Sequence, residues 1–369
     1  MWINHLSLKN FRSYDELELS LEPGVTIFLG RNGEGKTNIV ESLLYLAFLS
    51  SHRTANDQPL VKLGNQSAYV RAKAQNPERE ILVELEINAE KANRARINQN
   101  PVRSQKELYG IVQAVYFSPE DLDLVRGDPS GRRRFIDELL TLRSPRLAGV
   151  INDYERALKQ RNSLLKSRSS YASLASWDQQ VAEFGGELIA ARIKTLGDFE
   201  PIFTEVYKEI SKEKTALINY KCSIDNPTEN AAENTEKILL KMADIKTQEI
   251  DRGLTLVGPH RDDLLLVLGD HFVKGYASHG ESWSIALSLK LATYQLLQNE
   301  GAKPILILDD VFSELDEERR NHMIALANSA EQTFITVAVQ TDLPPNLFGT
   351  TYQVKSGSVK LVSLANNET

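Results

Sequence analysis

The stretch that decides the fold is Gly30-Arg31-Asn32-Gly33-Glu34-Gly35-Lys36-Thr37, which fits the phosphate-binding pattern G-x-x-x-x-G-K-[ST] at every fixed position. The apolar run 25–29 before it predicts a short buried strand, and residues 38–49 predict a helix because apolar side chains recur at helical spacing. A strand, a glycine-rich loop and a helix together aim backbone N–H groups and a positive helix end at phosphate oxygens. The sequence therefore predicts a nucleotide site.

Each part of this loop has an expected role. Glycines let the backbone curl without Cβ clashes. Lys36 would reach the β- and γ-phosphates of ATP, and the Thr37 hydroxyl would ligate Mg²⁺. We expect nucleotide contacts from the whole loop and its neighbour, namely Gly30, Arg31, Asn32, Gly33, Glu34, Gly35, Lys36, Thr37 and Asn38.

Composition narrows the class of protein. The 369 residues suggest two domains or one large one, and 41% apolar with 25% charged residues is ordinary for a globular protein. The formal net charge of −7 argues against a protein that coats nucleic acid through bulk charge. A single cysteine allows no internal disulfide, no apolar run matches a membrane span, and the N-terminus does not resemble a signal peptide. We expect a cytoplasmic protein.

Secondary-structure patterns divide the chain into three parts. Strand-like alternation fills much of the first 117 residues, helical patterns dominate from residue 130 to about 209, and α/β alternation returns near the C-terminus. We further expect a loop over residues 225–236 and strands over residues 254–257 and 264–268. The predicted class is an α/β ATPase head assembled from both ends of the chain (1–117 and 253–369), with an inserted, mainly helical domain (118–252).

A second motif supports the nucleotide site. The apolar strand Ile305–Leu308 ends in Asp309 and Asp310. A carboxylate at the end of a strand beside the phosphate loop is where P-loop ATPases bind Mg²⁺, so we assign Asp309 to the metal and Asp310 to the attacking water. Aspartate is one methylene shorter than the glutamate common at that position, which predicts hydrolysis slower than about 10 per second.

A third motif precedes the last long predicted helix. Ser278, Gly280 and Glu281 belong to Ser278-His279-Gly280-Glu281, which reads either as a simple N-cap or as an anion-binding helix end. Its place before the acidic strand matches the signature loop of ATP-binding-cassette proteins, which binds the γ-phosphate of ATP held by the other subunit. The segment 313–316 fits the dimer-contact loop that follows.

Four segments together resemble the RecF family, bacterial recombination-repair ATPases related to the chromosome-maintenance (SMC) heads. They are Asn10–Tyr14 before the loop, the long run Pro119–Asp137, Gly258–Asp263, and Asp309–Asp316. The resemblance covers nearly the whole length. Gln340-Thr341-Asp342 stands where transporters carry a histidine switch, and Glu120 lies where they carry a glutamine loop.

The resemblance implies a function in DNA repair and replication restart. It implies an ATP- and Mg²⁺-dependent homodimer that binds double-stranded DNA near single-strand gaps and works with RecO and RecR to help RecA load. It also implies a weak, DNA-stimulated ATPase that acts mainly as an ATP-gated switch. By analogy with related heads, Arg12 is a candidate contact to the phosphates or adenine.

DNA contacts are sought in the basic stretch 126–168, which holds eleven basic and five acidic residues, a difference of +6. A solvated helix face is the plain alternative. The candidates are Arg132, Arg133, Arg156, Lys159 and Arg161, although the first two belong to the family signature and equally suit a structural role at the domain junction.

Two other classes remain open at this point. A P-loop kinase or phosphotransferase would explain Lys36 and Asp309 but not the segments 278–281 and 313–316. The energising ATPase of a transporter or another ABC/SMC assembly would explain those segments, but it would not carry a basic helical insertion or lack the histidine switch.

Overall fold

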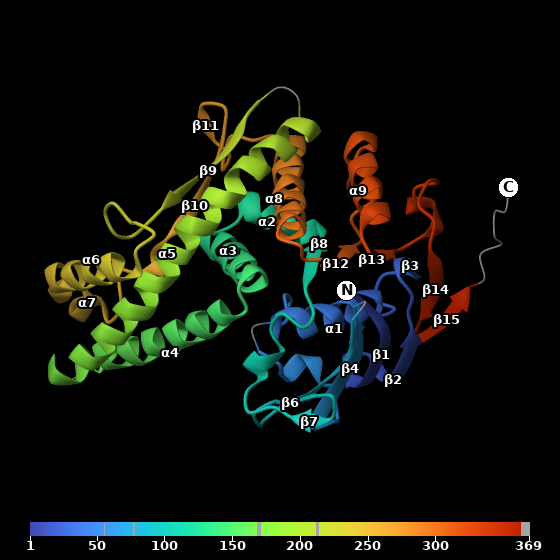
Figure 1. Ribbon diagram of the computed structural model, residues 1–369, viewed down its shortest axis with the longest axis horizontal. Helices are drawn as coiled ribbons and strands as arrows, with labels where there is room; N and C mark the ends of the chain where they lie inside the picture. Colours follow the sequence, from blue (N-terminus) through green and yellow to red (C-terminus); the bar gives the residue numbers. More distant parts are fainter. Residues whose placement is uncertain (55, 77, 168–170, 212–213, 363–369) are drawn as a thin grey trace. The chain divides into compact units, whose positions relative to one another are not determined.

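The computed structural model describes residues 1–54, 56–76, 78–167, 171–211 and 214–362 (Figure 1). It divides into two compact units. The first combines residues 1–121 with the C-terminal segment from Thr293, and the second comprises Leu122–Ala292. Both chain ends therefore build the first unit. Within the described residues, no helix has the length and apolar character needed to cross a membrane.

The first unit contains a six-stranded mixed sheet in the order β15-β14-β3-β13-β12-β8. The five strands from β14 to β8 are parallel, and β15 pairs antiparallel at one edge. Strand β13 is buried along its whole length, and after Gln332 it consists only of apolar residues and threonine, as expected of a strand covered on both faces. The strands are β3 (Gly24–Leu29), β8 (Ala114–Phe117), β12 (Ile305–Asp309), β13 (Gln332–Val337), β14 (Thr350–Lys355) and β15 (Ser358–Val362).

An antiparallel sheet in the order β2-β1-β4-β5-β6-β7 completes the strands of this unit. Strand β4 alternates strictly between buried and half-buried residues, as expected when one face is packed and the other meets solvent. The strands are β1 (Trp2–Phe11), β2 (Tyr14–Ser20), β4 (Ser67–Gln75), β5 (Glu80–Asn88), β6 (Arg94–Ile97) and β7 (Asn100–Pro101).

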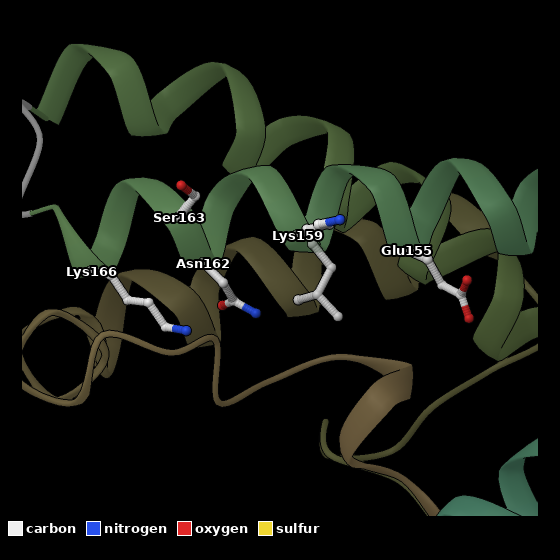
Figure 2. A pocket seen from close by; sticks show the side chains of 6 residues that line it. Glu155, Lys159, Asn162, Ser163 and Lys166 are labelled. Atoms are coloured by element: carbon white, nitrogen blue, oxygen red, sulfur yellow. The ribbon is translucent and has the colours of Figure 1, made fainter. Parts of the chain in front are cut away.

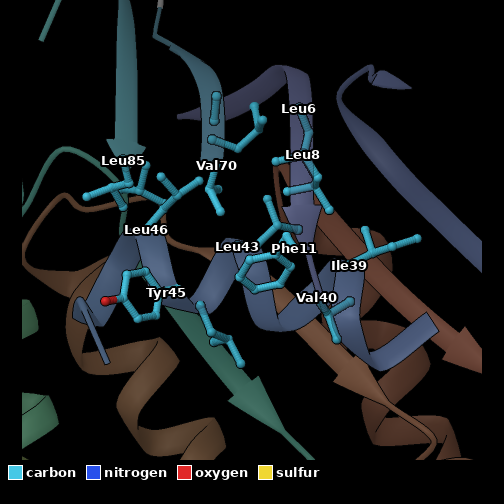
Figure 3. Packing of buried hydrophobic residues seen from close by; sticks show 14 of the residues in the cluster. Leu6, Leu8, Phe11, Ile39, Val40, Leu43, Tyr45, Leu46, Val70 and Leu85 are labelled. Carbon is cyan, nitrogen blue, oxygen red and sulfur yellow. The ribbon is translucent and has the colours of Figure 1, made fainter. Parts of the chain in front are cut away.

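Helix α1 (Lys36–Phe48) is almost entirely buried and packs in one apolar cluster with both sheets. Figure 3 shows Leu43 and Tyr45 of α1 in the same cluster as Phe11 of β1 and Val70 of β4. This packing fixes the helix whose N-terminus follows the glycine-rich loop. The unit also contains α9 (Glu317–Ser329), the end of α8 (His279–Asn299), and the short 3₁₀ helices η1 (Gln58–Leu60), η2 (Gln105–Leu108), η3 (Pro119–Asp121) and η5 (Gln340–Asp342).

The second unit is mainly helical around its own core, in which α4 and α5 contribute many of the buried side chains. A three-stranded antiparallel sheet in the order β11-β10-β9 belongs to it. Its elements are α2 (Leu122–Arg126), α3 (Pro129–Arg143), α4 (Arg146–Lys166), α5 (Tyr171–Ile210), β9 (Ala216–Lys221), α6 (Ala231–Asp244), α7 (Lys246–Arg252), η4 (Pro259–Arg261), β10 (Asp263–Leu268), β11 (His271–Phe272) and most of α8 (His279–Asn299).

The predicted class is confirmed, but three local expectations need correction. Residues 254–257 form no strand, and α6 begins at Ala231 inside the segment expected to be a loop. Residues 253–292, expected in the head, group with the helical unit. The reason is strand pairing, because β10 pairs with β9 over six residues from Asp263 to Leu268.

Candidate nucleotide site

The glycine-rich loop joins β3 to α1 and is supported on two sides. A Cβ at Gly30 would lie 2.3 Å from the carbonyl oxygen of Val354 on β14, so only glycine allows this approach. Gly35 has φ +108°, and a Cβ there would lie 2.9 Å from the side-chain oxygens of Ser13 and Tyr14. The loop is therefore held between β14 and the β1–β2 turn in a conformation that L side chains rarely adopt.

The Lys36 side chain lies folded over the loop. It is only 5% exposed, and its Nζ donates to the Arg31 carbonyl oxygen at 3.3 Å and to Asn32 Oδ1 at 3.4 Å. Burial lowers the pKa of the Lys36 ammonium, while the carboxylates of Asp310 and Asp309 act in the opposite direction. The loop therefore concentrates a cation and backbone N–H groups where an anion would sit.

Asp309, at the end of β12, is held from three directions. Thr37 Oγ1 of α1 donates to its Oδ1 at 3.3 Å, and Thr336 Oγ1 of β13 donates to the same oxygen. Tyr116 of β8 donates its hydroxyl to Oδ2 at 3.2 Å. Burial raises the pKa of Asp309, whereas these three hydrogen bonds lower it. The two predicted metal-site residues, Thr37 and Asp309, thus come together.

Asp310 lies at the C-terminal end of β12 with the left-handed φ of +58°. Its backbone N–H donates to the carbonyl and hydroxyl oxygens of Thr336 at 3.2 and 3.1 Å. Aspartate tolerates this conformation better than most residues with a Cβ. The structure thus gives a backbone reason for the short acid at this position.

Glu34 of the loop and Asn38 of α1 have structural partners. Glu34 accepts hydrogen bonds from the backbone N–H and hydroxyl of Ser356, in the turn between β14 and β15, and these bonds lower its pKa. Asn38 Nδ2 donates to Ser13 Oγ at 2.9 Å. Arg31 and Asn32 are exposed. Glu34 therefore fixes the loop to the β14–β15 hairpin.

Arg12 points its guanidinium at α1. It pairs with Glu41 through two hydrogen bonds of 2.8 and 2.6 Å and donates to the Pro59 carbonyl oxygen. Glu41 is fully buried and also accepts from Ser51. In this structure Arg12 stabilises a buried carboxylate behind the loop. Among the described residues, its guanidinium donates hydrogen bonds to Glu41 and Pro59 and to none of the loop residues 30–37.

Ser278 and Glu281 form a capping box at the start of α8, within the helical unit. The Ser278 backbone N–H donates to Glu281 Oε2 at 2.8 Å, and the Glu281 N–H donates to Ser278 Oγ at 3.2 Å. Lys214 lies 2.6 Å from Glu281 Oε1, and this contact, with the capping bonds, lowers the pKa of Glu281 to about 2. Ser278 and His279 are exposed and Gly280 is half-buried. The helix start is thus preformed and accessible.

Two of the basic residues proposed for DNA are buried in ion pairs. Arg132 is 5% exposed and pairs with Asp263 at 2.8 Å, and Arg161 is 2% exposed and pairs with Glu249 at 2.6 Å. Arg133 is half-buried and donates to the Asp262 carbonyl oxygen at 2.9 Å. These contacts correct the DNA assignment of Arg132 and Arg161, since their charges face the protein interior.

Arg156 and Lys159 remain on the exposed face of α4. The Arg156 side chain is 72% exposed and lies 3.2 Å from Asp153. An open groove of about 460 Å³ runs beside this helix (Figure 2). Its lining residues are Glu155, Leu158, Lys159, Asn162, Ser163 and Lys166.

Comparison with known proteins identifies the family. The RecF/RecN/SMC N-terminal domain matches residues 2–356. The "DNA replication and repair protein RecF" of Streptomyces avermitilis is 48% identical and covers 98% of this chain and 100% of its own length. That of Rhodococcus erythropolis is 45% identical and covers 96% of this chain and 94% of its own. The chain belongs to the RecF family.

Solved structures agree with this assignment. The structure of the recombination mediator protein RecF-ATPrS in the RecFOR pathway is similar with a TM-score of 0.90 and 27% identity, covering 98% of each chain. An SMC head bound to the C-winged helix domain of ScpA has a TM-score of 0.58 at 16% identity, covering 100% of this chain and 99% of its own, and it shows the shared fold alone. The first unit thus has the fold of an ABC/SMC-type head.

Two of the family segments, Pro119–Asp137 and Gly258–Asp263, are linked by side-chain contacts within the helical unit. Besides Arg132 and Arg133, Asp137 of the first segment pairs with the buried Arg192 at 2.9 Å, and Arg192 donates to the Pro259 carbonyl oxygen of the second at 2.8 Å. His260 contacts the Tyr154 hydroxyl at 2.6 Å and the Thr255 carbonyl oxygen at 3.0 Å. These RecF signature residues therefore organise the core of the unit.

Sequence reasoning missed two residues of the site, Tyr116 and Thr336. Both lie on strands that flank β12, and Thr336 is the register partner of Asp309. Neither belongs to a spacing motif. Tyr116 pairs with Ile307, two positions before Asp309. Knowledge of the strand order and register would have found both residues, because positions two apart on a strand share a face.

Proposed function

We propose that this RecF-family chain is an ATP-gated DNA-binding protein of replication and recombinational repair. The observation that carries the proposal is the junction of Thr37 and Asp309 at the N-terminus of α1, behind a loop that keeps Lys36 buried. Curated relatives of nearly full length are DNA replication and repair proteins, and a similar solved structure carries ATPrS. ATP binding, rather than rapid turnover, would be the event that changes DNA affinity.

The residues present fit ATP and Mg²⁺. The loop 30–35, with Lys36, would cradle the phosphates, and Thr37 and Asp309 would hold the metal. Among the described residues no three His, Cys, Asp or Glu side chains gather to bind a metal on their own. Proteins usually bind Mg²⁺ through one or two side chains together with substrate phosphates. The bound ion would neutralise phosphate charge, and Asp310 would orient the attacking water.

Two chains would complete the ATP site. The helix start at Ser278–Glu281, where Ser278 and His279 are exposed, would present a positive dipole end to an anion. ATP on one chain would contact this helix start of a second chain, so binding would favour a homodimer. The segment 313–316, where Ser313 and Glu314 are exposed, would lie at the same interface.

Double-stranded DNA would be bound mainly through its phosphates. Arg156 and Lys159 are the predicted contacts that stay exposed, and Lys166 lies two turns further along α4 on the same groove. Such contacts give affinity that falls steeply with salt and depends little on sequence. We also propose that the protein prefers gapped DNA. It would work with RecO and RecR as partners and help RecA to load.

DNA binding with and without a slowly hydrolysed ATP analogue tests this function. Labelled duplex should bind the wild type more tightly with the analogue and Mg²⁺, and Lys36→Ala should remove that gain. Lys303→Ala is the matched control, because it removes an exposed lysine of the same unit that lies outside the loop. Equal DNA affinity with and without the analogue would refute ATP gating.

A further inference from the structure

The hydroxyl of Tyr116 holds one oxygen of the predicted metal carboxylate. It donates to Asp309 Oδ2 at 3.2 Å, while Oδ1 accepts from Thr336 and Thr37. Strands β8 and β13 flank β12, so Tyr116 and Thr336 clamp the carboxylate from both sides. Without the phenol, Oδ2 has no other recorded donor among the described residues.

His52, just beyond α1, fixes the phenol in turn. Its Nε2 lies 3.2 Å from the Tyr116 hydroxyl oxygen. The centroids of the two rings are 4.7 Å apart, and the ring planes are inclined at 49°. A phenol has one proton, and a carboxylate only accepts, so Nε2 must donate to the phenol oxygen. The contacts therefore form an ordered line from His52 through Tyr116 to Asp309.

We infer that Tyr116, oriented by His52, is a positioning residue that sets how tightly Asp309 retains Mg²⁺. The inference rests on the proposed ATP and Mg²⁺ site. When Thr37 turns to the metal, Tyr116 and Thr336 are the groups left to orient the carboxylate. Partners of this kind in metal sites typically change metal affinity by 10- to 100-fold when removed.

Thermal unfolding of the full chain at fixed ATP and increasing Mg²⁺ measures the metal requirement without relying on activity. Tyr116→Phe removes one oxygen and keeps the ring. We expect its half-saturating Mg²⁺ concentration to rise about tenfold, with ATP binding in EDTA unchanged. Tyr352→Phe is the control, because Tyr352 donates to the Ser20 carbonyl oxygen, a contact that does not involve Asp309.

His52→Phe keeps a ring beside Tyr116 and removes its donor. It should shift the Mg²⁺ requirement in the same direction, and the double variant should be no worse than Tyr116→Phe alone, because the residues act in series. An unchanged Mg²⁺ requirement in Tyr116→Phe overturns the inference while leaving the ATP site intact. A wild type that ATP and Mg²⁺ do not stabilise at all refutes the proposed function and the inference with it.

Discussion

The Thr37 hydroxyl lies 3.3 Å from Asp309 Oδ1, although 272 positions separate the two residues in the chain. The contact exists because β3, which leads into the loop, and β12, which ends in Asp309, are separated in the mixed sheet only by β13. Parallel strands place their carboxyl ends at one edge, so the loop and the acid meet there. This arrangement is the structural basis of the proposed ATP switch.

Asp310→Asn should slow hydrolysis while preserving ATP binding. Asparagine keeps the shape of the side chain and tolerates the left-handed φ of +58°, so the fold should not change. We expect wild-type turnover below about 10 per second and a fall of about 100-fold in the variant. Phosphate release, measured beside nucleotide affinity, checks both; full turnover in Asp310→Asn would remove this residue from the chemistry.

Arg161→Ala should destabilise the helical unit strongly. The substitution leaves Glu249 buried without its ion-pair partner, which typically costs about 4 kcal/mol of unfolding free energy. Arg156→Ala, on the exposed face of the same helix, should cost less than about 0.5 kcal/mol. Urea unfolding measures both variants. Similar losses for the two would contradict the assigned roles.

DNA affinity should depend on the exposed cations of α4. Lys159→Ala removes one predicted phosphate contact, so it should weaken duplex binding for all sequences alike and lower the salt slope by about 1. Glu155→Gln, on the same groove, is the control and should not weaken binding. Titrations of labelled duplex at several salt concentrations give both quantities. A sequence-dependent loss, or an unchanged slope, would place the DNA elsewhere.

His260 should make stability depend on pH. Burial lowers its pKa to about 4 from an ordinary value of 6.5, so the unfolded chain binds the proton more readily. The free energy of unfolding should therefore fall as pH drops from about 6.5 to about 4, by about 3 kcal/mol in all. Below that window His260 is protonated in both states and adds no further change.

His260→Gln should flatten this part of the pH profile, whatever it does to stability at neutral pH. The measurement is urea unfolding of wild type and variant at pH 7, 6, 5 and 4. Parallel profiles for the two proteins would show that His260 does not titrate differently on folding.

The loop and the acidic strand were predictable from sequence because their chemistry is local. Gly30–Thr37 and Asp309 each follow an apolar strand, and a fixed pattern marks the first. The roles of Tyr116 and Thr336 could not be predicted from sequence, because they come from strand pairing between segments far apart in the chain. No spacing rule carries that information.

The buried arginines were misjudged for a different reason, although a signal existed. On α4 the buried residues Leu147, Tyr154 and Arg161 recur at seven-residue spacing, so Arg161 lies on the apolar face. Arg156 does not lie on that face. The net charge of the whole stretch does not distinguish exposed from buried cations. Helical periodicity does, because it separates the exposed Arg156 from the buried Arg161.

We propose that the ATP site of one chain is completed by Ser278 of a second chain. The most direct test measures the mass of the protein in solution with Mg²⁺ and a slowly hydrolysed ATP analogue, for wild type, Ser278→Asp and Ser278→Arg. Aspartate can still cap the helix, so the fold should be kept, but its negative charge repels a phosphate. Loss of the dimer in this variant therefore reports on assembly and not on folding. We predict a dimer for the wild type and monomers for both variants, each still binding the analogue. A wild type that stays monomeric with the analogue bound, or a Ser278→Asp variant that dimerises as the wild type does, would show that Ser278 does not complete the ATP site of a second chain.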